Sequence, residues 1–437
     1  MIRGCTNGRA AGARASGPGV RLIMAKSDLE DLGRRAVDAA RILAATGSAA
    51  KDAALRLTAE LLEEHSHDLL EANAVDVQAA HAAGADATAL DRLTLSPQRI
   101  GAMAAGLRQV AALPDPVGEV VEGSVRPNGL RVARVRVPLG VVAIIYENRP
   151  NVTSDAAGLC LKAGNATMLR GSSSALESNR AIVRLLRQAL SKAGLPEDAV
   201  VLVEDVSHEA AVDFMQLEAI DCLIPRGGHS LVDSVRRNAT VPVVVDGDGN
   251  CHLYVDAGAD LDMALDIVVN AKTQRPGVCN AVESLLVHRA VAAEFLPRAA
   301  GAMAEVELVG DEAARAVVPG MGVATEEDYA TEFLALKLAV AVVDDLDAAI
   351  AHIARFGSGH SEAIVTTDIA SAERFCREVD AAAVVVNTST RFVDGGELGL
   401  GAEIGISTQK LHARGPMGLR ELTSAKWIVR GDGQVRR

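Results

Sequence analysis

Residues 141–151 read VVAIIYENRPN, and this stretch decides the class of fold. Six apolar residues in a row, from Val141 to Tyr146, are typical of a strand that is buried on both faces. Polar residues follow at once, among them Asn148 and Asn151. Ligands of open α/β sheets bind beyond the carboxyl ends of the strands, so this polar end is a candidate ligand site. The alternative is that the asparagines only form turns or caps.

Short apolar segments alternate with helical segments around this strand. Further strands are expected over 166–170, 200–205, 219–224 and 241–245, and in a second unit over 282–287, 338–343, 362–366 and 382–386. Helices are expected over 174–193, 208–216, 260–272, 345–355 and 369–379, and residues 27–110 read as helical. Strands that alternate with helices predict parallel sheets, so the fold class is α/β.

The composition predicts an ordinary globular protein with a cytoplasmic location. The net charge is −13 and aromatic residues make up 2%, which argues against nucleic acid as a partner and favours a small-molecule substrate. No apolar run reaches the ~18 residues needed to span a bilayer, so no membrane segment is expected. Residues 1–23 carry four arginines and no acid, and we expect a disordered extension or a true start at Met24.

One of six cysteines stands apart from the others. No pair has CxxC spacing, so neither a metal site nor a disulfide framework is predicted. Cys279 lies in the loop sequence TQRPGVCN, residues 273–280, close to Arg275. A loop cysteine near a cation can be held as a reactive thiolate, although a lone cysteine often falls in a loop without any function.

Glycine patterns give a mixed indication of a nucleotide site. The G-x-G-x-x-G fingerprint is absent, since G-x-G at 247–249, 357–359 and 399–401 lacks the third glycine. The sequence PRGGHS, residues 225–230, follows an expected strand, and Gly227 and Gly228 would let backbone amides approach an anion. Glycines are also common in ordinary strand-to-helix turns, so this motif alone is weak.

Several segments, in one order, resemble the aldehyde dehydrogenase superfamily. They are RVPLGV (136–141), RPN (149–151), GNATMLR (164–170) and GVC (277–279). Longer motifs resemble the branch of that superfamily that reduces L-glutamyl 5-phosphate. They are YENRPNVT (146–153), LRGSSSA (169–175), PRGGHSLV (225–232), AKTQRPGVCNA (271–281) and GAEIGISTQKLHARGPMGL (401–419). The resemblance covers about residues 27–431.

This resemblance implies two parallel-sheet α/β domains plus a small β element for oligomerisation. The expected boundaries are 24–124 and 142–272 for a cofactor-binding domain, 273–393 for a catalytic domain, and 125–141 with 394–437 for the β element. It also implies a homo-oligomer, either dimer or tetramer, and a functional link with glutamate 5-kinase.

The implied reaction is the NADPH-dependent reduction of L-glutamyl 5-phosphate to L-glutamate 5-semialdehyde and phosphate, the second step of proline biosynthesis. The Cys279 thiolate would attack the acyl carbon to form a thioester. Asn151 matches the asparagine that stabilises the oxyanion in this superfamily. Arg275 is a candidate partner of the leaving phosphate. Candidates for the remaining substrate contacts are Asn280, Thr388 and Ser389.

The resemblance also indicates the cofactor. Arg170 stands at a lysine position and Ser173 at the glutamate position of NAD-preferring members. A cation and a hydroxyl without a carboxylate suit a 2′-phosphate, so NADP(H) is expected. Glu332 matches the glutamate that holds the nicotinamide ribose, the alternative being a solvated glutamate on a helix. The expected cofactor-binding residues are Arg170, Ser172, Ser173, Gly227, Gly228 and Glu332.

Other functions remain open at this point. A hydrolytic NAD(P)-dependent aldehyde dehydrogenase needs a glutamate base upstream of the cysteine, but residues 244–248 read VVDGD, where Asp246 could be a shorter substitute. A cysteine hydrolase or acyltransferase would need a histidine base, for which the candidates are His229, His252 and His360. A non-catalytic binding module is the third alternative.

Overall fold

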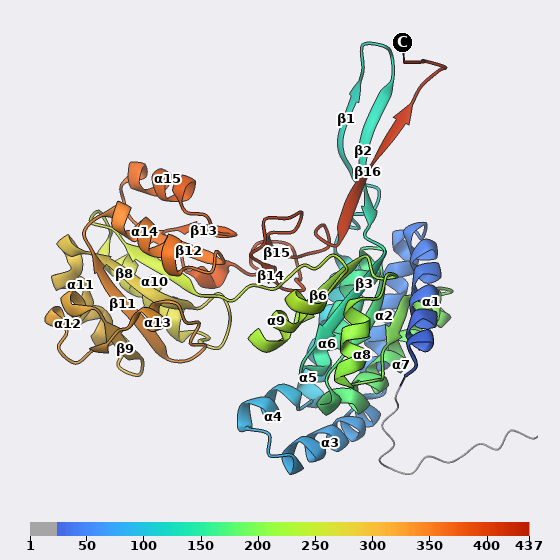
Figure 1. The fold of residues 1–437 in the computed structure, drawn as a ribbon, viewed down its shortest axis with the longest axis horizontal. Coiled ribbons are helices and arrows are strands. Elements are labelled where there is room, and N and C mark those ends of the chain that lie inside the picture. Colours follow the sequence, from blue (N-terminus) through green and yellow to red (C-terminus); the bar gives the residue numbers. More distant parts are fainter. Residues whose placement is uncertain (1–23, 437) are drawn as a thin grey trace, which may run out of the picture.

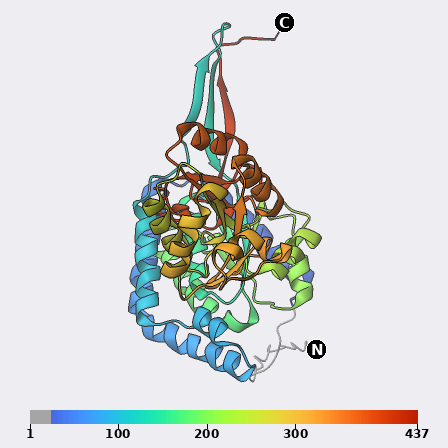
Figure 2. The ribbon, with the colours of Figure 1, turned by 90° about the vertical axis from the view of Figure 1, so that its left-hand side faces the viewer.

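A computed structural model describes residues 24–436, and the predicted extension 1–23 lies outside them. Two α/β lobes are joined side by side, and a three-stranded sheet projects from them (Figure 1). Figure 2 shows the same sheet extending beyond both lobes. The main sheet of each lobe is parallel, which confirms the predicted fold class. Among the described helices, none is long and apolar enough to cross a membrane.

The first lobe contains a four-stranded sheet in the order β5-β4-β3-β6. Its strands are β3 (Val141–Tyr146), β4 (Ala166–Arg170), β5 (Val200–Leu202) and β6 (Cys222–Arg226). Every residue of β3 is buried, as its apolar run predicted. Only an isolated bridge between Leu223 and Val243 represents the strand expected over 241–245, so that expectation was wrong.

Helices surround this sheet. Five precede it, namely α1 (Lys26–Ala44), α2 (Ser48–Glu64), α3 (Ser66–Ala82), α4 (Ala87–Leu93) and α5 (Pro97–Ala112). The helices α6 (Pro150–Lys162), α7 (Leu176–Lys192), α8 (His208–Met215) and α9 (His229–Asn238), with the 3-10 turns η1 (Ser173–Ala175) and η2 (Glu197–Ala199), follow individual strands. The chain passes from β3 outward to β5 and then returns to β6 on the other side of β3. Ligands of open α/β sheets bind at such a switch point, so a site is expected beyond the carboxyl ends of β3 and β6.

The second lobe is built on a seven-stranded parallel sheet in the order β10-β9-β11-β8-β7-β12-β13. Its strands are β7 (Cys251–Val255), β8 (Val282–His288), β9 (Glu307–Gly310), β10 (Gly322–Val323), β11 (Lys337–Val343), β12 (Ser361–Val365) and β13 (Ala383–Val386). Its helices are α10 (Leu261–Thr273), α11 (Arg289–Ala302), α12 (Glu312–Val317), α13 (Glu326–Tyr329), α14 (Leu346–Phe356) and α15 (Ile369–Glu378), with the 3-10 turn η3 (Thr390–Phe392). Separate apolar clusters fill the two faces of this sheet.

The predicted boundary between residues 272 and 273 was wrong. Strand β7 pairs with β8 and β12, so the second lobe begins near residue 251. Helix α10 packs on α11 and β8 in the same lobe. The sequence did not indicate this strand because its first two residues are Cys251 and His252, which the fold nevertheless buries completely.

The projecting sheet consists of β1 (Val120–Val125), β2 (Arg131–Pro138) and β16 (Thr423–Arg430), paired antiparallel. It therefore begins before the predicted residue 125. Only the end of the predicted segment 394–437 joins it. The earlier part, with β14 (Ile406–Ser407) and β15 (Gly415–Pro416), packs through residues such as Ile404 and Met417 into the core of the first lobe.

Candidate active site

Cys279 lies in the loop between α10 and β8, as predicted. Its carbonyl oxygen accepts a hydrogen bond from Sγ of Cys251 at 3.1 Å. Gly249 passes so close that a Cβ atom there would lie 1.7 Å from the same oxygen. Only glycine fits at position 249. The contacts of Gly249 and Cys251 with the Cys279 carbonyl therefore restrict the loop of the candidate nucleophile.

The thiol of Cys279 is protonated at neutral pH in the absence of ligands. Burial is the main cause that raises its pKa to about 11, and the charges of Glu332 and Glu403 raise the pKa further. Arg226 acts in the opposite direction but does not compensate. The expectation that nearby cations hold a resting thiolate was therefore wrong, and a group that removes the proton is needed.

Arginines surround this thiol. Burial, Arg92 and Arg275 lower the pKa of Arg149, while burial and Arg275 lower the pKa of Arg391. A negative charge on Cys279 raises the pKa of both Arg149 and Arg391. The two arginines therefore lie close to the thiol. Neither Arg149 nor Arg275 forms an ion pair within residues 24–436, although the chain is acidic overall. Unpaired like charges at one place are typical of a site that binds an anion.

Sequence analysis had identified only Arg275 in this cluster. Arg149 and Arg226 stand in two of the quoted motifs, directly after β3 and at the end of β6. Their positions at the carboxyl edge of the sheet could have indicated both. Arg391 lies in η3, where its Nε donates to Oε1 of Gln274 at 2.9 Å, and no motif pointed to it.

Asp246 does not serve as a free base. One of its oxygens forms an ion pair with Arg226, and the other accepts the backbone N–H of Ile406 at 2.7 Å. The carboxylate thus holds Arg226 and ties the C-terminal segment to the first lobe. The suggestion that Asp246 replaces the glutamate of hydrolytic enzymes has no support in this geometry.

Asn151 lies in the first turn of α6, at the carboxyl end of β3. Its Nδ2 donates to Oδ2 of Asp155 at 2.9 Å. The second amide proton has no partner within the described residues. Arg149, two positions earlier, interacts electrostatically with Cys279, so Asn151 is placed at the edge of the same site.

Two predicted substrate contacts are structural. Asn280 is 3% exposed, its Nδ2 donates to the carbonyl of Val393 at 2.9 Å, and its own carbonyl accepts from Thr390. Ser389 is buried and caps η3 by accepting the N–H of Arg391. The Nδ2 of Asn280 and the hydroxyl of Ser389 thus hold the chain itself, while Oδ1 of Asn280 has no hydrogen-bond partner within the described residues. Thr388 is half-buried, and no contact is assigned to it.

The predicted cofactor residues gather at the carboxyl ends of β4 and β6. Arg170 is 9% exposed and donates to the carbonyl of Ser207 at 2.6 Å, while its buried Nε has no partner within the described residues. Ser172 bonds to Oδ1 of Asn148 at 2.9 Å and shapes the loop after β3. Ser173 is exposed at the start of η1.

The glycine pair before α9 approaches a carboxylate of the chain itself. The N–H of Gly228 donates to Oε2 of Glu147 at 3.0 Å. A Cβ atom on Gly227 would lie 2.7 Å from the same carboxylate, so glycine allows the two to approach closely. The helix end therefore attracts an anion, as expected for the N-terminus of a helix.

Glu332 lies beside Cys279, between α13 and β11. Its Oε1 accepts the N–H of Gly249 at 2.8 Å, and burial raises its pKa. The alternative of a solvated glutamate on a helix was wrong. Glu332 thus binds the loop that lies against the backbone of Cys279.

No candidate histidine is placed to act as a base. His252 and His360 are completely buried, and His252 pairs with Glu362 at 3.0 Å. Burial lowers the pKa of His360 to about 4. His229 is exposed and lies 3.1 Å from Asp248. A histidine-dependent hydrolase is therefore not supported.

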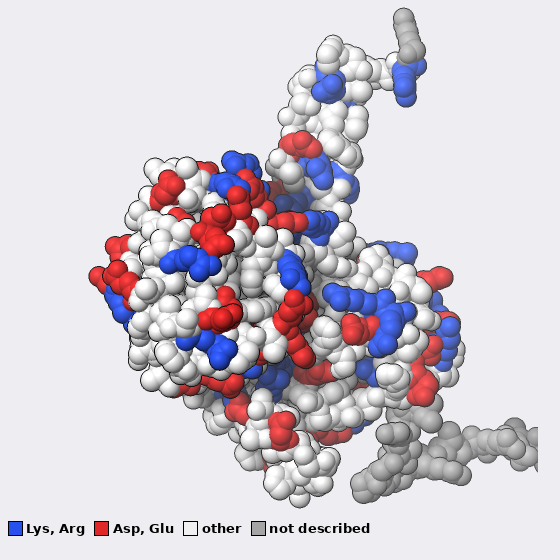
Figure 3. All heavy atoms as spheres, turned by 60° about the vertical axis from the view of Figure 1, so that its left-hand side comes forward, with Lys and Arg blue, Asp and Glu red and all other residues white. Residues whose placement is uncertain are grey.

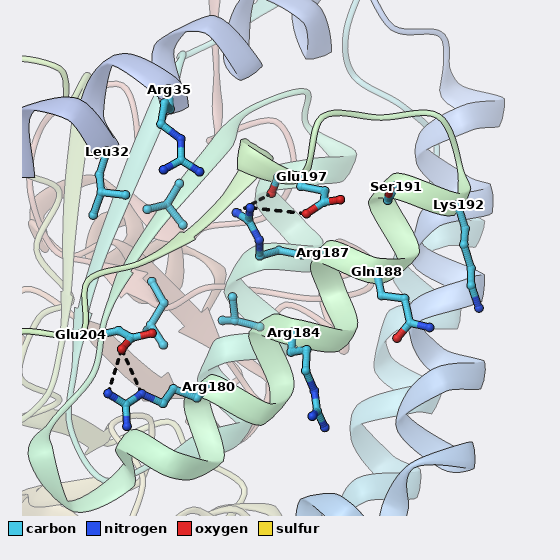
Figure 4. A pocket seen from close by; sticks show the side chains of 13 residues that line it. Leu32, Arg35, Arg180, Arg184, Arg187, Gln188, Ser191, Lys192, Glu197 and Glu204 are labelled. Carbon is cyan, nitrogen blue, oxygen red and sulfur yellow. Dashed lines mark hydrogen bonds and ion pairs between the residues drawn. The ribbon is translucent and has the colours of Figure 1, made fainter. Parts of the chain in front are cut away.

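A separate groove runs along the edge strand β5, two strands away from β3 (Figure 4). Arg180 pairs there with Glu204, and Arg187 pairs with Glu197. These arginines are neutralised by carboxylates, unlike Arg149 and Arg275 near Cys279. The groove is therefore not the candidate active site.

Comparisons with known proteins agree with this architecture. Residues 23–327 match the family described as the aldehyde dehydrogenase family. A crystal structure of gamma-glutamyl phosphate reductase from Thermotoga maritima has a TM-score of 0.92 at 48% identity, over 94% of this chain and 100% of that one. An acetylating aldehyde dehydrogenase from Geobacillus thermoglucosidasius, at 17% identity and a TM-score of 0.66, shares the fold. The chain therefore belongs to the aldehyde dehydrogenase family.

Within that family, two similar curated proteins carry the same name. The gamma-glutamyl phosphate reductase of Moorella thermoacetica is 57% identical over 412 residues, which are 94% of this chain and 99% of that protein. The protein of the same name from Heliobacterium modesticaldum is 55% identical over 413 residues, with the same shares of each chain.

Proposed function

We propose that this protein reduces L-glutamyl 5-phosphate to L-glutamate 5-semialdehyde and phosphate with NADPH, the second step of proline biosynthesis from glutamate. The observation that carries the proposal is a half-buried thiol close to Arg149 and Arg275, neither of which has a carboxylate partner within residues 24–436. This site suits an anionic acyl donor. The name of the relatives agrees with the same reaction.

In the first half of the reaction, the sulfur of Cys279 attacks the acyl carbon and the bond to phosphate breaks. Arg275 and Arg149 bind the phosphate as it leaves, because their guanidinium groups are not neutralised. Asn151 and the backbone N–H of Cys279 donate to the developing oxyanion. The carboxylate of Asp246 is fully engaged and does not activate water, so the thioester is protected from hydrolysis.

The site fits a nicotinamide dinucleotide at the carboxyl edge of the first sheet. The exposed Ser173 is available for a phosphate group, with the positive charge of Arg170 at the end of β4. Gly227 and Gly228 would bind a phosphate where it displaces the Glu147 carboxylate from the N–H of Gly228. No carboxylate stands at position 173, which favours NADPH over NADH. When bound, the dinucleotide supplies the two electrons that reduce the thioester. Glu332 would hold its ribose.

The proposal includes self-association through the projecting sheet and a cytoplasmic location. Trp427 and Val429 are exposed on one face of this sheet, at 59% and 56%, an apolar surface suited to a second copy. Figure 3 shows Lys and Arg at its outer end. Because an acyl phosphate is made by phosphorylating a carboxylate, a functional link with glutamate 5-kinase is part of the proposal.

The reverse reaction tests the function. Reduction of NADP⁺ with L-glutamate 5-semialdehyde should require phosphate, whereas a hydrolytic aldehyde dehydrogenase would work without it. Phosphate-independent turnover would overturn the proposal. The Cys279→Ala variant should lose activity in both the forward and the reverse reaction. The matched control is Cys376→Ala, at an exposed cysteine on α15.

A further inference from the structure

Arg391 lies in the short turn η3 and has no part in the reaction described so far. Its side chain is half-buried, and it forms no ion pair with a carboxylate of residues 24–436. Asp394, whose charge acts on Arg391, accepts the N–H of Gly396 at 2.8 Å instead. A charge that is partly buried without a partner costs stability, so this guanidinium suits an anion that comes from outside the chain.

Hydrogen bonds hold η3 against the loop of the candidate nucleophile. Thr390 donates to the carbonyl of Asn280 at 2.7 Å. In return, Nδ2 of Asn280 donates to the carbonyl of Val393 at 2.9 Å. Arg391 lies between these two contacts in the chain, and Asn280 directly follows Cys279. The backbone that carries Arg391 is therefore fixed beside the loop of the thiol.

The side chain of Arg391 is oriented as well. Its Nε donates to Oε1 of Gln274 at 2.9 Å, and Gln274 directly follows α10 and precedes Arg275. The backbone N–H of Arg391 donates to Oγ of Ser389 at 3.3 Å. Neither Nη atom donates a hydrogen bond within the described residues. The guanidinium thus keeps two parallel N–H groups free, the arrangement that binds a carboxylate with two hydrogen bonds.

Electrostatics agree with this placement. Burial and the charge of Arg275 lower the pKa of Arg391, whereas a negative charge on Cys279 raises it. The second lobe therefore contributes a further cation to the site, on a different element from Arg149 and Arg275.

The proposed substrate has two anionic groups. L-glutamyl 5-phosphate carries its phosphate on the acyl carbon that Cys279 attacks, and its α-carboxylate at the opposite end of the carbon chain. The phosphate is assigned to Arg149 and Arg275. Arg391 is the arginine whose guanidinium is fixed in advance by a side-chain hydrogen bond, which lowers the entropy lost when a ligand is bound in one orientation.

We infer that Arg391 binds the α-carboxylate of the substrate and thereby selects an amino-acid acyl phosphate over acyl phosphates that lack a carboxylate. This inference rests on the proposed function. Asn280 and Ser389, which were expected to contact the amino-acid end, would then act indirectly, because their hydrogen bonds fix η3.

The test compares two aldehydes in the reverse reaction, the reduction of NADP⁺ in the presence of phosphate. 4-Aminobutanal has the structure of L-glutamate 5-semialdehyde without the carboxylate. In Arg391→Ala, kcat/KM for L-glutamate 5-semialdehyde should fall about 10- to 100-fold, mainly through KM, because hydrogen bonds to a charged group are lost. For 4-aminobutanal, kcat/KM should not change.

The KM for phosphate should also stay the same in Arg391→Ala. A higher KM for phosphate would assign Arg391 to the leaving group and overturn the inference. Where the turnover of 4-aminobutanal is too slow to measure, the KM for phosphate and the KM for the semialdehyde decide together. A KM for the semialdehyde that does not rise would overturn the inference as well.

Further variants separate the possible failures. Arg377→Ala removes an exposed arginine from α15 and should leave the kinetics with both aldehydes unchanged. Arg391→Lys keeps the charge without the parallel N–H groups and should lose part of the preference for the semialdehyde. Equal losses with both aldehydes and a lower Tm in Arg391→Ala would mean that Arg391 only stabilises η3, against the inference. Turnover of the semialdehyde by the unsubstituted protein without phosphate would instead overturn the proposed function.

Discussion

The side-chain amide of Asn151 donates from Nδ2 to Oδ2 of Asp155 at 2.9 Å. An ionised carboxylate only accepts hydrogen bonds, so Asp155 determines which end of the amide faces it. One N–H of Asn151 is thereby fixed, and the other is left for an oxyanion. Asp155 is in this sense a positioning residue.

Protonation of Asp155 should weaken this arrangement. Burial raises the pKa of Asp155 to about 6, although hydrogen bonds from Asn151 and Ser154 lower the pKa in part. Below pH 6 the neutral carboxyl group can donate to the amide oxygen, and Asn151 can turn around. We expect the rate of phosphate release in a single turnover to fall as the pH drops through 6.

The Asp155→Ala variant should lose this pH step and release phosphate about 10-fold more slowly, which corresponds to about 1.4 kcal/mol. Asp213→Asn on α8 is the control. The alkylation of Cys279 should not change. A pH step near 6 that persists in Asp155→Ala would contradict the assignment.

Removal of an unpaired arginine should weaken binding of the acyl phosphate. For Arg149→Ala and Arg275→Ala, kcat/KM with glutamyl phosphate should fall by about 10- to 100-fold, because a hydrogen bond to a charged group contributes about 1.5–3 kcal/mol. The KM for NADPH should remain the same. Arg377→Ala, an exposed arginine on α15, is the matched control. Equal losses with both substrates would indicate a folding defect.

Much of the fold could be predicted from the sequence because its strands are continuous apolar runs. The run from Val141 to Tyr146 forms β3 without a change of bounds. Strand β7 was missed because its polar His252 is buried only through Glu362, which lies 110 residues away. Periodicity contains no information on a partner so distant in the chain.

The site was predicted only in part for a similar reason. The motif placed Cys279 in a loop, which the structure reproduces. Asn280 looked available because its neighbour is the candidate nucleophile, but its amide is used by Val393.

A carboxylate at position 173 should reverse the expected cofactor preference. Ser173 is exposed at the start of η1, and Ser173→Glu would place a negative charge where we propose that the 2′-phosphate binds. We expect kcat/KM with NADPH to fall about 100-fold relative to NADH, an electrostatic effect of about 2.7 kcal/mol. Ser191→Glu, also exposed on α7, is the control. An unchanged ratio would place the 2′-phosphate elsewhere.

Lys272 and Glu283 form an ion pair in which both side chains are completely buried, with Nζ 2.5 Å from Oε2. The second oxygen of Glu283 accepts the N–H of Leu334, so the pair also supports the segment that carries Glu332. Burial raises the pKa of Glu283 to about 7, and Lys272 limits the increase. Because the folded state binds this proton more tightly than the unfolded chain, the contribution of Glu283 to stability decreases as the pH rises from about 4.3 towards 7.

Lys272→Met should leave an unpaired charge in the core. We expect the free energy of unfolding to fall by about 3–5 kcal/mol at pH 8, and by clearly less at pH 5, where Glu283 is protonated. Urea denaturation at the two pH values measures the difference. Lys272→Met combined with Glu283→Gln should recover most of the loss at pH 8. Arg289→Met, which breaks an exposed pair with Asp344, should cost less than about 1 kcal/mol. An equal loss at pH 5 and pH 8 would mean that Lys272 acts through packing rather than through its charge.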